Sequence, residues 1–205
     1  MYGGTPTINP ISFEKKKIYG KRIDTISDYY SSRYDKTVIS NYNLGSSITK
    51  VGNHALENEK GILNLTADYV EIFGDYALSD SSFFKLKSVN PLRWIEIGKY
   101  AFKNCYGFTE AKIPDIEIIK DYAFYNSGLK EIELGANLKK IGIGAFDKCI
   151  DLKLVKIESF TPPILFGDIF SQCPASLQIL VPDTSLSDYL NNEQWRIYKN
   201  NIKGY

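Results

Sequence analysis

The chain repeats one short pattern about every 22 residues. A small residue followed by a large apolar one recurs at steps of 22, 24, 22, 22 and 24 residues, with isoleucine as the first member of the last pair. The six pairs are Ala55-Leu56, Ala77-Leu78, Ala101-Phe102, Ala123-Phe124, Ala145-Phe146 and Ile169-Phe170. We call the first residue of each pair the anchor. A period of roughly 20–50 residues is the signature of repeat architectures, in which each unit stacks on the next.

Positions at a fixed distance from the anchor also match. The residue four places before it is always large and apolar, from Val51 to Leu165, and the residue three places before it is glycine in four of the six copies. After each anchor an apolar stretch ends on two residues that are two apart, such as Ile132 and Leu134, as in a strand with one buried face. The pattern therefore predicts that each unit contains a strand, a turn, a second short apolar segment, a glycine turn and a compact helical or irregular stretch that carries the anchor.

Such a unit cannot bury its apolar side alone, whereas stacked neighbours bury it together. We predict an α/β repeat fold, a solenoid of six to seven coils of 22–25 residues with short strands, over residues 23–182. Residues 1–22 are predicted as a lead-in or tether, and the first coil is a weak copy with Tyr30 and Ser31 in place of the anchor pair. Residues 183–205 are predicted as a C-terminal cap. Large apolar residues in this cap, such as Trp195 and Tyr198, either cover the last coil or dock a partner.

The charge balance limits the kinds of partner. Lysine and arginine (25) nearly cancel aspartate and glutamate (24), which argues against a protein that coats nucleic acid or anionic lipid. No stretch approaches the roughly 20 consecutive apolar residues of a membrane-spanning helix, so no membrane insertion is predicted. No leader peptide is visible at the start of the sequence. If a leader has been removed, we expect a cell-surface or secreted location. Otherwise we expect a virion-associated or cytoplasmic one.

Residues that could carry chemistry have a packing explanation. Cys105, Cys149 and Cys173 all lie four places after an anchor, in a column they share with Ser81 and Ser127, which predicts interior packing and neither a disulfide nor a metal site. His54 is the single histidine of the chain, so no histidine relay is available. Glycine-rich phosphate-binding motifs are missing from the sequence. We therefore predict no catalytic, cofactor-binding or metal-binding residues and no enzyme activity.

Two sets of residues are candidates for binding a partner. The first set faces outward between the buried positions of the strands: Lys112, Lys130, Glu131, Glu133, Lys153 and Lys156. Their alternating charge suits a mixed-charge protein partner better than a polyanion, and the alternative is a face that is merely soluble. The second set lies one place before the anchor: Tyr29, Tyr76, Tyr100 and Tyr122. These tyrosines either form a binding surface or stack to stiffen the solenoid.

The repeat resembles the BspA-type leucine-rich repeats of bacterial surface proteins. The resemblance is carried by the unit I-G-x-x-A-F-x-x-C-x-x-L-x-x-I-x-I-P, which stands most clearly at Ile97–Cys105 with Phe108, Ile113 and Pro114 after it. It returns at Ile141–Cys149, and the tail from Val181 onward is similar to the terminal segment common in that family. The resemblance implies a right-handed leucine-rich-repeat solenoid.

The resemblance also implies binding in place of chemistry. Proteins of this type are generally surface-exposed or secreted, and several act as adhesins, so we expect a non-catalytic protein-protein interaction module with a host-matrix, cell-surface or assembly protein as its partner. The alternative is a structural component of a larger assembly, such as a virion decoration or receptor-binding protein tethered by residues 1–22. The identity of the ligand and the oligomeric state are not predicted.

Overall fold

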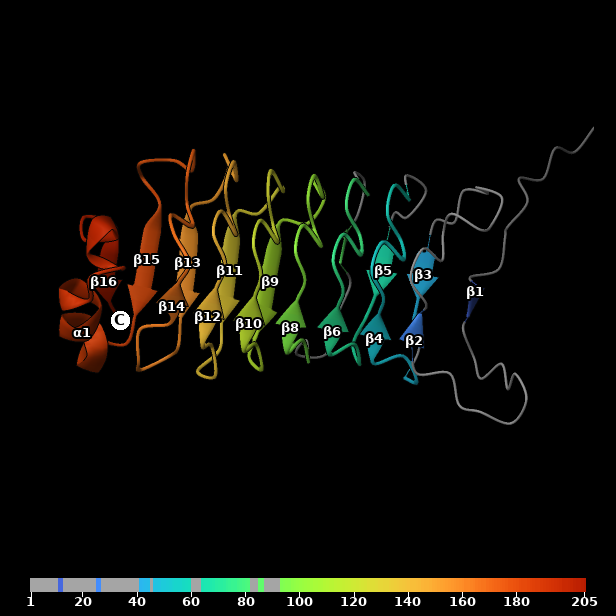
Figure 1. Ribbon diagram of the computed structural model, residues 1–205, viewed down its shortest axis with the longest axis horizontal. Helices are drawn as coiled ribbons and strands as arrows, with labels where there is room; N and C mark the ends of the chain where they lie inside the picture. The colour runs from blue at the N-terminus through green and yellow to red at the C-terminus, as the bar shows by residue number, and fades with distance from the viewer. Residues whose placement is uncertain are drawn as a thin grey trace, which may run out of the picture.

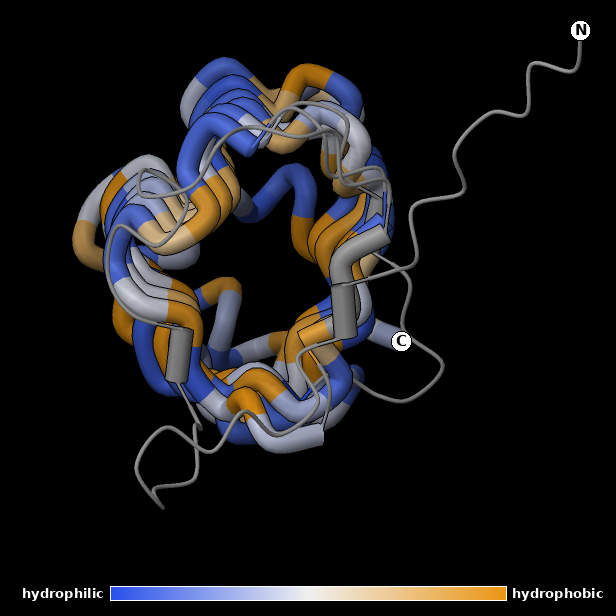
Figure 2. Tube along the Cα trace, turned by 90° about the vertical axis from the view of Figure 1, so that its right-hand side faces the viewer, coloured by the Kyte–Doolittle hydropathy of each residue, from blue (hydrophilic) through white to orange (hydrophobic). Residues whose placement is uncertain are grey.

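The chain winds into a parallel β-solenoid of about six turns (Figure 1). The computed structural model describes residues 11–12, 25–26, 41–44, 46–59, 64–81, 85–86 and 93–205. Within these residues each coil contributes one strand to each of two sides of the solenoid. Viewed along the axis, the coils superimpose, and apolar residues lie on the side of the trace that faces the interior (Figure 2), where their side chains form one core. The predicted solenoid of stacked repeats is confirmed.

The longer strands follow the anchors, as the alternating pattern predicts. In the C-terminal half they form a five-stranded sheet of β9 (Glu110–Ile113), β11 (Glu131–Leu134), β13 (Leu154–Ile157), β15 (Gln178–Val181) and β16 (Ile202–Gly204). Toward the N-terminus a four-stranded sheet contains β1 (Ile11–Ser12), β3 (Asn41–Asn43), β5 (Asn64–Thr66) and β7 (Lys85–Leu86). Strand β1 lies within the segment 1–22 and pairs with β3.

A seven-stranded sheet of two-residue strands forms the other side. Its members are β2 (Thr25–Ile26), β4 (Lys50–Val51), β6 (Ile72–Phe73), β8 (Glu96–Ile97), β10 (Ile118–Ile119), β12 (Lys140–Ile141) and β14 (Ile164–Leu165). The register pairs Val51 with Phe73, Phe73 with Ile97 and Ile97 with Ile119, which are the residues four places before successive anchors. The predicted column therefore sets the stacking of the coils.

The segment that carries each anchor pair is a series of turns and contains no helix in the described coils. The backbone takes a positive φ one place before the anchor, as at Tyr76 (55°) and Tyr100 (54°), and again three places after it, as at Asp80 (63°) and Asn104 (56°). A positive φ is incompatible with a right-handed helix, so the two positions limit the segment to turns. The amides of these turns bond to the next coil instead, for example from Leu78 to the Ala101 carbonyl at 2.8 Å.

Small and aromatic side chains alternate through the core. The five anchor alanines are fully buried, and the phenylalanines that follow them stack from coil to coil. Ring centroids are 5.5 Å apart between Phe102 and Phe124, 5.3 Å between Phe124 and Phe146, and 5.4 Å between Phe146 and Phe170. From Phe102 to Phe170 the residue after the anchor therefore supplies a stacked aromatic ring in each coil, next to a column of small anchor residues that leaves room for it.

The C-terminal residues close the solenoid. A 3₁₀ turn η2 (Asp183–Ser185), a short helix α1 (Leu186–Asn191), a second 3₁₀ turn η3 (Arg196–Tyr198) and strand β16 lie at this end (Figure 1). Trp195 and Tyr189 are fully buried, and they donate hydrogen bonds to the carbonyls of Pro163 (2.7 Å) and Ser159 (2.9 Å). The side chain of Gln194 bonds both the amide (3.0 Å) and the carbonyl (2.6 Å) of Leu165. These residues cover the last coil, and Ile197 stays exposed.

Candidate partner-binding surfaces

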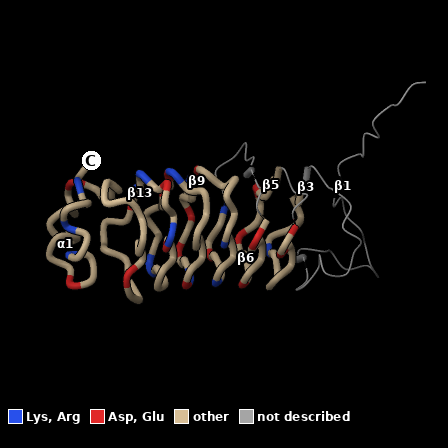
Figure 3. The backbone as a smooth tube through the Cα atoms, turned by 90° about the horizontal axis from the view of Figure 1, so that it is seen from above, with Lys and Arg blue, Asp and Glu red and all other residues tan. Residues whose placement is uncertain are grey.

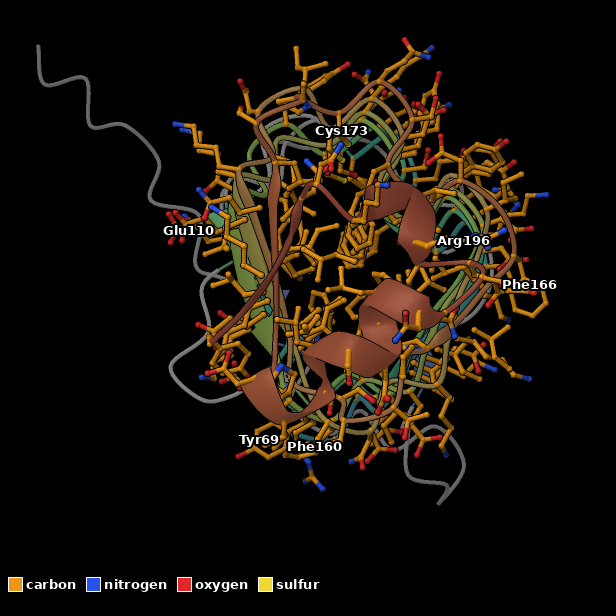
Figure 4. The ribbon with its side chains drawn as sticks, turned by 90° about the vertical axis from the view of Figure 1, so that its left-hand side faces the viewer. Tyr69, Glu110, Phe160, Phe166, Cys173 and Arg196 are labelled. Atoms are coloured by element: carbon orange, nitrogen blue, oxygen red, sulfur yellow. The ribbon has the colours of Figure 1, made fainter. Side chains whose placement is uncertain are left out.

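The outward side chains of β9, β11, β13, β15 and β16 form one continuous surface, which we call the strand face. Strand register places them in two rows that cross the strands. The first row is Glu110, Glu131, Leu154 and Gln178, and the second row is Lys112, Glu133, Lys156, Leu180 and Lys203. Figure 4 shows Glu110 on the outside of the solenoid, on the side opposite Phe166. Four predicted binding residues thus lie in these two rows.

The charges of the second row are bonded to one another. The Lys112 ammonium is 2.8 Å from a Glu133 carboxylate oxygen, and the Lys156 ammonium is 3.8 Å from the same oxygen. Lys156 also pairs with Glu158 at 3.3 Å and lies 4.6 Å from the ring centroid of Tyr205. The hydrogen bond between Lys112 and Glu133 lowers the pKa of the glutamate and raises the pKa of the lysine. Lys112, Glu133, Lys156 and Glu158 therefore form an ordered cluster whose charges cancel, and Lys203 adds one positive charge at the far end of the second row. Figure 3 shows the charged residues along the solenoid in blue and red.

The other predicted residues of this face make no ion pair in the described part of the chain. Glu110 and Glu131 are direct neighbours in the strand register and both are exposed. Lys130 and Lys153 are exposed as well, and each lies immediately before its strand, with the Lys153 amide bonded to the Lys130 carbonyl at 2.8 Å. Two unpaired glutamates and two unpaired lysines are thus available beside the ion-paired cluster of the second row.

The predicted tyrosines stack face to face along the turn segments. Ring centroids are 4.8 Å apart between His54 and Tyr76, and 5.0 Å apart both between Tyr76 and Tyr100 and between Tyr100 and Tyr122. Tyr125 meets the rings of Tyr100 and Tyr122 edge to face. Stacking is therefore one role of this column, with all three tyrosine side chains half-buried. Tyr29 and the first-coil residues Tyr30 and Ser31 lie outside the described residues.

A hollow of about 510 Å³ runs beside the stacked tyrosines. Its lining is Tyr76, Tyr100, Lys103, Tyr122, Tyr125 and Asp147. The sequence predicted Tyr76, Tyr100 and Tyr122 as candidate binding residues. It did not predict Lys103, Tyr125 and Asp147, which come two places after successive anchors. Their spacing could have indicated that they lie beside the tyrosines. Residues one place before and two places after an anchor are three apart and lie on the same turn.

The cysteines have the packing role that their column predicts. All three thiols are free, and each donates to a carbonyl of the preceding coil: Cys105 to Leu78 (3.2 Å), Cys149 to Phe124 (3.1 Å) and Cys173 to Phe146 (3.1 Å). Burial raises the pKa of all three, that of Cys149 to about 11. His54 Nδ1 bonds Glu57 at 2.7 Å on the surface of its turn.

We expect the three thiols to be almost unreactive toward a disulfide reagent in the folded protein. Only the thiolate reacts, so a rise in the pKa of Cys149 from 9.0 to about 11 lowers its reactive fraction at pH 8 by roughly 100-fold before any steric protection is counted. The measurement is the rate of colour release from Ellman's reagent at pH 8, with the urea-unfolded chain as the control. Native thiols that react as fast as the unfolded ones would contradict the interior column.

The stacked parallel coils define the class of this molecule, which is a leucine-rich-repeat solenoid. The sequence profile described as "BspA type Leucine rich repeat region" matches residues 7–96 and 95–192 in six copies. The chain belongs to this family. Leucine-rich-repeat solenoids are typically non-catalytic scaffolds that bind other proteins over an extended surface.

Solved structures share the fold at low sequence identity. A leucine-rich-repeat protein of T. pallidum superimposes with a TM-score of 0.57 and 17% identity, covering 88% of this chain and 89% of its own. A leucine-rich cell-surface protein from Faecalibacterium prausnitzii superimposes with a TM-score of 0.51 and 17% identity, covering 80% of this chain and 60% of its own. No curated protein matches the sequence. Among the described residues, no helix has the length and apolar character needed to cross a bilayer.

Proposed function

We propose that this protein is an adhesin-like binding protein, displayed on a cell surface or secreted, that recognises a protein ligand through the strand face. The observation that carries the proposal is the arrangement of charge on that face, where an ion-paired cluster of zero net charge lies beside a row of unpaired charges. Membership of the BspA-type repeat family supports binding as the activity. The cell-surface relative from Faecalibacterium prausnitzii supports the location.

The second row favours a protein over a polyanion. Lys112, Glu133, Lys156 and Glu158 hold each other in place and sum to zero charge. Affinity for nucleic acid depends on many lysines and arginines that neutralise phosphates, and these four residues offer no excess of them. A partner with charges of both signs gains from such a pattern, because electrostatic complementarity fixes the register of an interface and rejects wrong partners.

The first row indicates the sign of one charge on the expected partner. Glu110 and Glu131 lie opposite each other in adjacent strands, about 4.8 Å apart along the sheet, where like charges destabilise the pairing. A lysine or arginine of a partner placed between them would remove this repulsion. We therefore expect the ligand to contribute a basic side chain to this part of the interface.

A charge swap tests the strand face without breaking its internal bonds. Lys112→Glu, Glu133→Lys, Lys156→Glu and Glu158→Lys together keep every ion pair of the row with its sign inverted and leave the net charge unchanged. We expect at least a tenfold loss of affinity, because each complementary contact becomes a repulsive one. The measurement is surface plasmon resonance on immobilised host matrix proteins, with binding of labelled protein to cultured epithelial cells alongside.

The matched control swaps an ion pair of the seven-stranded side. Lys139 and Glu117 are 2.7 Å apart there, and the double change Lys139→Glu with Glu117→Lys should leave binding unaltered. Both variants should keep a free energy of unfolding within about 0.5 kcal/mol of the parent, as is usual for surface substitutions. A four-residue swap that binds like the parent would exclude the strand face. Failure of the parent to bind any matrix protein or cell would contradict the adhesin-like role.

A further inference from the structure

The hollow beside the tyrosines has the size and shape of a ligand site. Its volume of about 510 Å³ lies within the roughly 300–1,000 Å³ of small-molecule sites. Its lining is two rows, which we call walls: Tyr76, Tyr100 and Tyr122 form one, and Lys103, Tyr125 and Asp147 form the other, with the Tyr125 ring touching Tyr100 and Tyr122 edge to face. Because each wall gains one residue per coil, the hollow extends along the solenoid axis across four consecutive coils. A ligand that fills it must be elongated.

The tyrosine wall presents edges and hydroxyl groups to this ligand. Stacking at 5.0 Å covers the ring faces of Tyr100 on both sides, by Tyr76 and by Tyr122. The edge of an aromatic ring is the positive part of its quadrupole, so the exposed edges of this wall attract oxygen atoms. The protein's own cations already lie over two of the lining rings, with the Lys99 ammonium 5.7 Å from the Tyr100 centroid and the Lys148 ammonium 4.9 Å from the Tyr125 centroid. Within the described part of the chain, the hydroxyls of these three tyrosines have no hydrogen-bond partner. Each can donate one hydrogen bond and accept others.

The opposite wall supplies an unpartnered acceptor and a donor. The Oδ1 atom of Asp147 is buried and has no hydrogen-bond partner among the described residues. A buried polar atom left without a partner is costly, and a ligand hydroxyl would satisfy it. The Lys103 ammonium pairs with Asp80 at 3.4 Å and retains hydrogens for a further bond. The charges of Lys103 and Asp147 cancel, so the lining as a whole favours a neutral ligand.

We propose that the hollow binds a neutral oligosaccharide whose chain runs along the solenoid axis. A sugar chain is elongated, uncharged and rich in groups that both donate and accept hydrogen bonds, and it repeats along its length as the tyrosine hydroxyls do. The site lies on the turn segments and shares no residue with the strand face. It is therefore a second binding activity, independent of the protein-binding function proposed above.

Calorimetric titration with cello-, malto-, xylo- and chito-oligosaccharides tests this assignment. At least one series should bind at millimolar concentration or below, with affinity that rises from the dimer to the hexamer because the site spans several coils. The triple variant Tyr76→Phe, Tyr100→Phe and Tyr122→Phe keeps the ring stack and removes three hydroxyls. It should bind the best hexamer at least tenfold more weakly and melt at the parent's temperature. Asp147→Asn should weaken binding as well, because it replaces a carboxylate acceptor.

Two controls separate this site from the other surface. The four-residue charge swap of the strand face should bind the hexamer like the parent, so failure of the protein-binding proposal leaves this result unaffected. Tetramethylammonium serves as a cationic probe and should not bind. The proposal is overturned if none of the four hexamers binds, if the folded triple phenylalanine variant binds like the parent, or if tetramethylammonium binds and displaces the sugar.

Discussion

Replacing Phe124 by alanine is expected to lower the free energy of unfolding by about 3–5 kcal/mol, the usual cost of truncating a buried phenylalanine. The Phe124 ring is fully buried and stacks on Phe102 on one side and on Phe146 on the other. Its loss therefore opens a cavity between two neighbouring coils. Because a solenoid is stabilised by contacts between adjacent repeats, the N-terminal and C-terminal coils should also lose part of their coupling. Urea unfolding followed by circular dichroism measures both effects. The lower free energy of unfolding appears as a lower midpoint, and the weaker coupling between coils appears as a broader transition.

The same substitution on the surface provides the control. Phe166 follows strand β14, is 59% exposed and points away from the solenoid (Figure 4). Phe166→Ala should change the free energy of unfolding by no more than about 0.5 kcal/mol. Equal effects of the two substitutions would show that the phenylalanine column does not hold the coils together.

Replacing Ala123 by leucine is expected to destabilise the protein by about 3 kcal/mol, the upper part of the range for overpacked cores. Ala123 is fully buried in the alanine column. Its coil cannot move away from its neighbours, because the Phe102 amide bonds the Ala123 carbonyl and the Phe124 amide bonds the Ala145 carbonyl, both at 2.8 Å. The added methyl groups must therefore displace the aromatic column or break this ladder. Thermal unfolding measures the effect.

Ala136 offers the matched position. It lies in the exposed turn after β11, where leucine has space, so Ala136→Leu should leave the melting temperature within a few degrees of the parent. An Ala123→Leu variant with the melting temperature of the parent would contradict the register that places the anchors inside.

Repetition is what made the fold predictable from the sequence. A single Ala-Phe pair indicates little, but six pairs in phase define which positions face inward, and the pairing of Val51, Phe73 and Ile97 follows from that phase. The turn conformation was open between helical and irregular. It depends on the left-handed backbone at Tyr76 and Asp80. Aspartate and asparagine, which recur in the column of Asp80, adopt this conformation more readily than most residues, but tyrosine does not signal it as glycine does.

The sequence predicted which residues share the strand face but not which of them form ion pairs. The repeat placed Lys112, Glu133 and Lys156 on one face, yet their ion pairs depend on side-chain rotamers that the spacing of residues does not determine. Only one wall of the hollow was predicted from the sequence. Tyr76, Tyr100 and Tyr122 share a residue type, whereas the opposite wall is built from three different residue types and leaves no visible column.

The most direct test of the central claim is hydroxyl-radical footprinting of the protein in complex with the matrix protein that it binds most tightly. We expect protection of peptides that contain Glu110 and Lys112, Glu131 and Glu133, and Lys156, with no change at Phe166 on the opposite side. Protection around Ile164 and Phe166, with the strand face still fully reactive, would contradict the claim.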